Sequence, residues 1–197
     1  MPVPVFTAGE TLDASEMNAV GLWRVTNCTV TSAGGTAATA SNGVITIGTG
    51  NTSVTVVNAF SASYDNYKIV ISGGVASNSV AMTLQLGGST TGYYGSLNYN
   101  LYTTSTPVAA GVNNAASFSY AGVGTANNLY MNLDLFLPFA SKKTGLAAQY
   151  IQHSTGASAG GTFGGFHDVA SSYTDFTIAT AGNTMTGGTI RVYGYRN

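Results

Sequence analysis

The sequence predicts an all-β protein, an antiparallel β-sandwich of the jelly-roll type with one short helical segment near the N-terminus. Three observations lead to this fold class. Apolar and polar side chains alternate over many short stretches, clusters of Gly, Asn, Ser and Thr separate these stretches, and no helical period occurs between them. A chain of 197 residues is long enough for one core, and about eight main strands favour a jelly roll.

The clearest strand is expected from Leu129 to Leu137. Every second residue there is Leu or Met, and the residues between are Tyr, Asn, Asp and Phe, so one face should pack on a core. Further strands are expected at 44–47, 54–57, 67–71, 82–86, 148–153, 163–169, 176–178 and 189–195. The glycine-rich runs 122–124 and 160–165 are interpreted as turns, bulges or close backbone contacts, because no helix follows them.

Residues 1–23 are expected to form a separate segment ahead of a β-domain at 24–197. Asp13 is a suitable helix N-cap and Glu16 completes a capping box, which predicts a helix from about residue 14 to 20. A helix this short needs a surface to dock on. It either packs on the same domain or anchors the chain in a larger assembly. The candidate anchor residues are Phe6, Leu12, Met17 and Trp23.

Charged residues are scarce, at 7% of the chain against about 25% in typical soluble domains, and the formal net charge is −1. Six Lys and Arg residues are too few for a phosphate-binding footprint, so we expect no nucleic-acid partner. The chain contains no apolar stretch of about 20 residues, so no membrane span is expected. A surface with so little charge favours burial against copies of the chain or against other proteins, although compositional drift would also produce it.

No set of residues predicts catalysis, so we expect a non-enzymatic protein without a cofactor. The seven carboxylates show no spacing typical of a glycosidase pair. His153 and His167 lie on separate expected strands, with Asp168 beside the second, and a third metal ligand is not identifiable. We therefore expect no metal site, and we interpret the two histidines as ordinary polar positions.

Tyrosines concentrate in one polar stretch, from Gly92 to Thr104. Tyr93, Tyr94, Tyr99 and Tyr102 lie there among Gly, Asn and Ser. Tyrosine combines a rigid ring with a polar tip, which suits recognition loops and stacking on sugars. These four residues are the candidate host-contact residues. The alternative is that the rings cover the edge of the sandwich or a contact between subunits.

Two parts of the chain resemble known proteins of tailed bacteriophages. Residues 6–18 read FTAGETLDASEMN, which resembles the opening of many fibre, baseplate-appendage and minor structural proteins of phages. Residues 60–71, FSASYDNYKIVI, and 187–197, GGTIRVYGYRN, resemble the body domain of phage fibre-like proteins. The resemblance implies a virion protein that assembles in the host cytoplasm and forms a homotrimer.

The resemblance also implies that the N-terminal segment contacts other virion proteins. The leading hypothesis is a trimeric fibre or spike whose β-domain attaches to the host surface, with a cell-surface glycan as a candidate ligand. A decoration (cement) protein of the capsid without a receptor is one alternative. A carbohydrate-active depolymerase module is another, and it would need two convergent carboxylates.

Overall fold

The computed structural model describes residues 21–153 and 158–195, and these residues form strands, turns and loops without a helix. All pairings between strands are antiparallel. The prediction of an all-β, antiparallel fold is therefore confirmed. The predicted helix lies outside the described residues, together with Phe6, Leu12 and Met17.

Seventeen strands occur in the described part of the chain. They are β1 (Leu22–Arg24), β2 (Thr29–Ala33), β3 (Thr39–Ser41), β4 (Val44–Thr46), β5 (Ser53–Val57), β6 (Asn66–Ser72), β7 (Val75–Ala76), β8 (Val80–Leu86), β9 (Tyr93–Leu101), β10 (Pro107–Ala115), β11 (Phe118–Gly124), β12 (Leu129–Phe136), β13 (Thr144–Gln152), β14 (Ala159–His167), β15 (Phe176–Thr180), β16 (Met185–Thr186) and β17 (Thr189–Tyr195).

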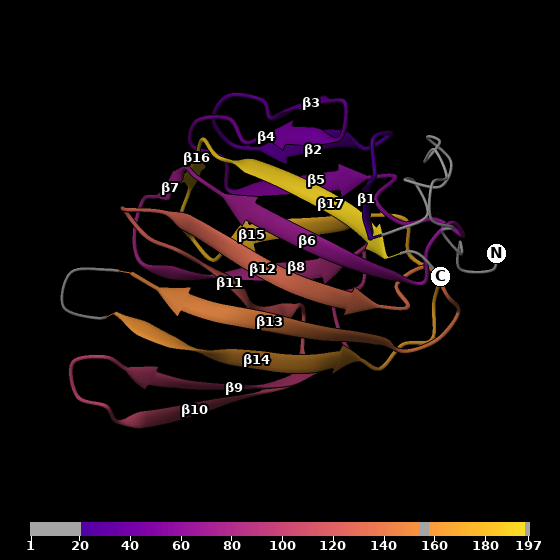
Figure 1. Ribbon diagram of the computed structural model, residues 1–197. Helices are drawn as coiled ribbons and strands as arrows, with labels where there is room; N and C mark the ends of the chain where they lie inside the picture. The colour runs from indigo at the N-terminus through magenta and orange to yellow at the C-terminus, as the bar shows by residue number, and fades with distance from the viewer. Residues whose placement is uncertain (1–20, 154–157, 196–197) are drawn as a thin grey trace, which may run out of the picture.

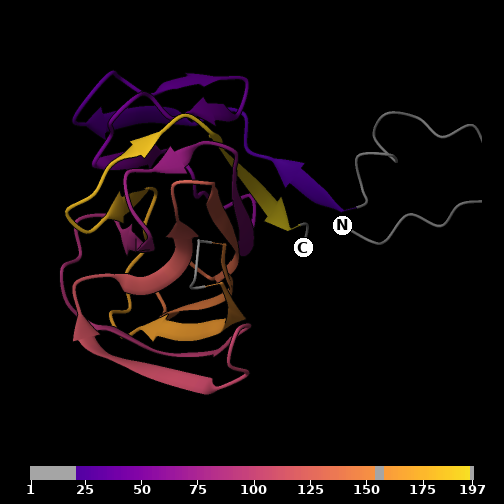
Figure 2. The same cartoon turned by 90° about the vertical axis from the view of Figure 1, so that its left-hand side faces the viewer.

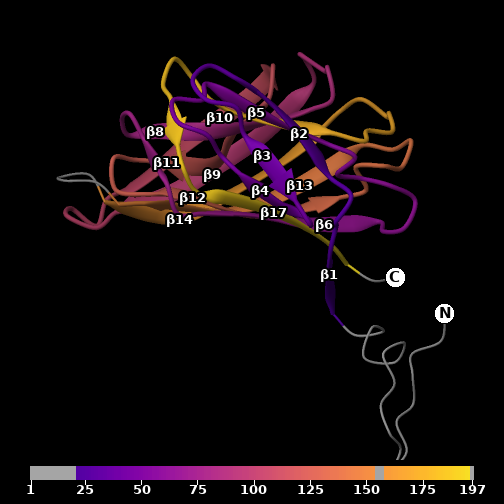
Figure 3. The ribbon, with the colours of Figure 1, turned by 90° about the horizontal axis from the view of Figure 1, so that it is seen from above.

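The strands form two layers. The front layer, which faces the viewer in Figure 1, has the order β10-β9-β14-β13-β12-β6-β17, with β4 and β1 pairing with β17 and β3 pairing with β4. The back layer has the order β11-β8-β15-β5-β2. A short pairing between β11 and β12 joins the two layers at one side. Figure 2 shows β3 and β4 at the end of the molecule opposite to the β9–β10 hairpin, and Figure 3 shows the layers edge-on.

The core lies between the layers and follows from the alternation in the sequence. In β12, the buried residues are Leu129, Met131, Leu133 and Leu135, and each intervening residue points away from the core. The strands β6, β8, β15 and β17 repeat this pattern and contribute to the same apolar cluster. Both layers are thus apolar inside and polar outside, as antiparallel sheets with one solvated face should be.

The predicted strands all occur, but two polar regions differ from expectation. The Tyr-containing stretch after Gly92 is not a loop: it forms β9, which pairs with β10 on one side and β14 on the other. The glycine-rich run 160–165 lies inside β14. Its glycines allow a close backbone contact, because a Cβ atom at Gly161 would lie 2.1 Å from the carbonyl oxygen of Asn98.

The sheet begins earlier than the predicted domain boundary. Leu22 pairs with Tyr195, and Trp23 pairs with Gly194, so both residues belong to β1 and to the front layer. Trp23 is half-buried there. The β-domain therefore includes these two residues, which the sequence had placed in the separate N-terminal segment. The two ends of the described chain lie side by side at one corner of the sheet (Figures 1 and 3).

Candidate binding face

The outer face of the front layer is the candidate functional site. In this layer every second side chain of a strand points away from the core, and the register of the strands arranges these outward side chains in rows across the sheet. Three neighbouring rows differ sharply in chemistry. We call them the aromatic row, the floor and the amide row, and define each by its residues below.

The aromatic row consists of Phe136, Phe166 and Tyr94. Phe136 on β12 is opposite Gly145 on β13, Gly145 is opposite Phe166 on β14, and Phe166 is opposite Tyr94 on β9. The rings of Tyr94 and Phe166 stack with their centroids 5.3 Å apart. Phe136 and Phe166 are among the exposed large hydrophobic residues, so this row presents apolar rings to solvent.

The floor is the adjacent row of small residues, Ala147, Gly164 and Ser96. They lie opposite one another on β13, β14 and β9, and all three are exposed. A Cβ atom at Gly164 would meet no atom within 4 Å. The floor is therefore lower than the rows on either side of it.

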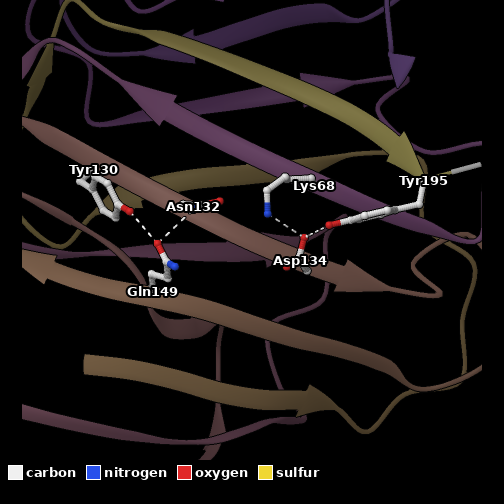
Figure 4. A network of polar contacts seen from close by, with 6 residues as sticks. All are labelled: Lys68, Tyr130, Asn132, Asp134, Gln149 and Tyr195. Carbon is white, nitrogen blue, oxygen red and sulfur yellow. Dashed lines mark hydrogen bonds and ion pairs between the residues drawn. The ribbon is translucent and has the colours of Figure 1, made fainter. Parts of the chain in front are cut away.

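The amide row consists of Gln149, Thr162 and Asn98, again opposite one another on β13, β14 and β9. Gln149 is held in place by its neighbours on β12 (Figure 4). Its Oε1 accepts hydrogen bonds from the Tyr130 hydroxyl at 2.8 Å and from Nδ2 of Asn132 at 3.0 Å. Both bonds use the amide oxygen. The two N–H groups of the same amide have no partner among the described residues.

An ion pair stands at the β6 end of the floor. Nζ of Lys68 lies 3.0 Å from Oδ1 of Asp134, and the two residues are opposite one another on β6 and β12. The Tyr195 hydroxyl donates a hydrogen bond to the same carboxylate oxygen (Figure 4). Burial, together with this bond and the negative charge of Asp134, raises the pKa of Tyr195 to about 12. The hydroxyl therefore stays protonated near neutral pH.

Two hollows lie over these rows and share Gln149 and Thr162. One, of about 370 Å³, extends toward β6 and is lined by Lys68, Asn132, Asp134, Ala147, Ala148, Gln149, Thr162, Phe163 and Gly164. The other, of about 580 Å³, extends toward the β9–β10 turn and is lined by Asn100, Leu101, Tyr102, Ser105, Gln149, Ile151, Gly160, Gly161 and Thr162. Together they form a trough across the strands, with both polar and apolar lining.

The four candidate tyrosines occupy different environments. The prediction for Tyr93 is wrong, because this residue is fully buried and its hydroxyl accepts a hydrogen bond from the Leu86 amide at 2.8 Å. Burial raises its pKa to about 12. Tyr99 is half-buried against Tyr150. Tyr94 belongs to the aromatic row, and Tyr102 is 63% exposed at the end of the larger hollow.

Sequence reasoning missed most residues of the trough. In β12, the alternation of apolar and polar residues in the sequence identifies the side chains that point outward. The other strands of the trough show no comparable alternation. Gln149, Gly164 and Asn98 become neighbours only through pairings between segments that are distant in sequence. The decisive signal would have been the alternation within β13 and β14, which small residues obscure.

His167 has a structural environment rather than a metal-binding one. It is fully buried, its Nε2 lies 3.1 Å from the Thr91 carbonyl oxygen, and its Nδ1 lies 3.3 Å from the Tyr173 hydroxyl. Burial lowers the pKa of His167, which favours the neutral ring. Within residues 21–153 and 158–195, no three His, Cys, Asp or Glu residues lie together as metal ligands would.

No family model, curated protein or solved structure matches this chain. The described residues also contain no helix that is long and apolar enough to cross a membrane.

Proposed function

We propose that the chain is a non-enzymatic structural protein of a bacteriophage virion, a homotrimeric fibre or spike that attaches to the host surface. In this proposal the described β-domain is a jelly-roll-like sandwich that the particle displays. The segment before Leu22 docks it on other virion proteins. The outer face of the front layer is the surface that meets the host.

The observation that carries this proposal is the trough on the outer face. An ordinary solvated sheet face carries many charged side chains, whereas the trough contains one ion pair, Lys68 with Asp134, and is otherwise lined by amide, hydroxyl, aromatic, aliphatic and small residues. Exposed rings beside uncharged polar groups are typical of recognition surfaces. The phage-like phrases at residues 6–18, 60–71 and 187–197 support placing this surface on a virion.

The trough favours binding over hydrolysis. Glycoside hydrolases use two carboxyl groups that flank the bond to be broken. Among the described residues that line the two hollows, Asp134 is the single carboxylate. Its Oδ1 is also engaged by Lys68 and Tyr195. These contacts support an attachment role over a depolymerase role.

Labelling of particles tests the proposal. Gold-conjugated antibodies raised against the β-domain should label the tail fibres or the tail tip of intact particles of the phage that encodes the chain, viewed by electron microscopy. Labels spread over the capsid lattice would instead support the cement alternative. Particles that carry no label while the protein is abundant in infected cells would overturn the virion proposal.

A further inference from the structure

The two hollows of the outer face have a shape and a chemistry that specify a class of ligand. We propose that they bind a neutral oligosaccharide that lies across β12, β13, β14 and β9, with Gln149 and Thr162 between two adjacent sugar subsites. This inference rests on the proposed attachment function and names its ligand class. Four properties of the hollows support this ligand class: their shape, their hydrogen-bonding groups, their apolar contacts and their charge.

The shape fits an extended chain of sugar rings. The floor residues Ala147 and Gly164 line the smaller hollow, and a Cβ atom at Gly164 would meet open space. Neighbouring strands lie about 4.8 Å apart, which is close to the length of one pyranose unit in an extended chain. Successive sugar rings can therefore repeat in step with successive strands, and the two hollows that meet at Gln149 and Thr162 fit consecutive units.

The polar groups match hydroxyl groups, which both donate and accept hydrogen bonds. Gln149 offers two N–H donors in a fixed orientation, since Tyr130 and Asn132 hold its oxygen. Thr162 contributes a hydroxyl, and Asn100 contributes an amide with both donor and acceptor atoms. A side chain that is already held by its neighbours loses little entropy on binding, which favours affinity.

Aromatic rings flank the polar groups, as saccharide sites require for the apolar faces of sugars. The Tyr102 ring is 63% exposed beside the larger hollow. It lies across Gly160, where a Cβ atom would be 2.2 Å from the Tyr102 hydroxyl oxygen. The stacked Tyr94 and Phe166 rings border the floor on its other side. A ligand on the floor therefore has an apolar border on one side and amides on the other.

The charge of the trough favours a neutral ligand. Lys68 is the single cationic residue among the described lining residues, and it is already paired with Asp134. An acidic sugar would find no unpaired cation and would approach the Asp134 carboxylate. Acidic glycans are usually bound through Arg or Lys, so the trough lacks the groups that would select them.

Calorimetry with defined hexasaccharides tests the inference on the full-length protein. The neutral probes are maltohexaose, cellohexaose, mannohexaose, xylohexaose and chitohexaose, and the acidic probe is hexagalacturonate. At least one neutral probe should bind, and hexagalacturonate should not. Gln149→Ala, which removes the central donors, and Gly164→Leu, which fills the floor, should each weaken binding by about tenfold or more.

Two matched variants control for general effects. Gln85→Ala removes an amide from β8 in the back layer, and Gly88→Leu adds the same side chain to an exposed glycine in the turn after β8 that is also open and lies outside the two hollows. Both should keep the affinity within about twofold of the unmodified protein. If the controls lose as much affinity as the site variants, the assignment of the site is wrong.

Three other results would overturn the inference: no neutral probe binds, the acidic probe binds more tightly, or Gly164→Leu alters only the self-association of the protein. The last result would make the face a contact between copies of the chain. Failure here is separable from failure of the proposed function. A labelled particle without sugar binding overturns the ligand class alone, and sugar binding without a labelled particle overturns the virion assignment alone.

Discussion

At the scale of single residues, the amide of one buried asparagine holds two loops together. Asn51 is fully buried between the loop after β2 and the loop after β4. Its Oδ1 accepts a hydrogen bond from the Gly48 amide at 2.8 Å, and its Nδ2 donates to the carbonyl oxygens of Gly34 at 2.6 Å and Thr36 at 2.8 Å. One buried side chain therefore satisfies three backbone groups from two loops.

Replacing Asn51 should be costly. The Asn51→Ala variant removes three hydrogen bonds that a fully buried side chain makes to the backbone, so the free energy of unfolding should fall by roughly 2–4 kcal/mol. Urea denaturation followed by circular dichroism measures this change. The control is Asn113→Ala, which alters an exposed asparagine on β10 and should change stability by less than about 0.5 kcal/mol. Equal effects of the two variants would contradict the role of Asn51.

The lowered pKa of His167 predicts how the stability of the protein depends on pH. Burial lowers its pKa in the folded protein, while its pKa in the unfolded chain is ordinary, about 6.5. The unfolded chain therefore binds the proton more readily. The contribution of the neutral ring to stability is complete above about pH 6.5 and is lost as pH falls through the lower folded pKa.

Denaturation at several pH values between about 7.5 and 5 tests this prediction. The free energy of unfolding should decline over this window in the unmodified protein and in the control His153→Gln. The decline should be smaller in His167→Gln, even though this variant loses stability at all pH values. A His167→Gln profile parallel to that of the unmodified protein would show that His167 does not cause the decline.

At the scale of elements, β14 contains two glycines that have different structural roles. Gly161 faces the core side, where the backbone of β9 approaches so closely that a Cβ atom would lie 2.1 Å from a carbonyl oxygen. Gly164 faces outward over open space. The same residue type therefore permits close packing at one position and forms the floor of the trough at the other.

A pair of alanine substitutions separates these purposes. Gly161→Ala should destabilise the protein by roughly 1–3 kcal/mol, because the backbone of β9 must move. Gly164→Ala should be neutral or should stabilise by up to about 1 kcal/mol, because alanine reduces the entropy of the unfolded chain without a clash. Thermal unfolding of both variants measures the difference. Similar losses at both positions would refute the close contact between β9 and β14.

The sequence predicted strands well where large apolar residues alternate and poorly where small residues replace them. β12 and β17 appear almost as predicted, and the alternating Leu and Met residues of β12 are the buried ones, as expected. β9 and the first half of β14 were assigned to loops and turns because they are rich in Gly, Asn and Ser. Each of the two strands pairs with a neighbour in sequence, β10 or β13, and the two also pair with each other, although they are distant in sequence. The trough, which lies on these strands, could not be predicted for the same reason.

At the scale of the whole molecule, low charge is the property that connects sequence, surface and assembly. Only 7% of the residues are charged, and the trough follows this composition. Electrostatic repulsion between copies is therefore weak, which permits close association. Both ends of the described chain lie at one corner of the sheet, so the rest of the outer face extends away from the point where the N-terminal segment joins β1.

Sedimentation equilibrium at micromolar concentration tests the association. A homotrimer would give about three times the chain mass of 20.0 kDa. This mass should change little with added salt, because few charged pairs are available to screen. A clean monomer over the whole concentration range would contradict the proposed trimer.

Competition for host cells tests the central claim most directly, because it links the trough to attachment. Purified full-length protein is added to host cells before the phage, and the adsorption rate of the particles is measured. The unmodified protein and the Gly88→Leu variant should slow adsorption in proportion to their concentration, while Gly164→Leu should not. Adsorption that stays unchanged with the unmodified protein, or that is slowed equally by Gly164→Leu, would contradict the claim that the outer face attaches the particle to its host.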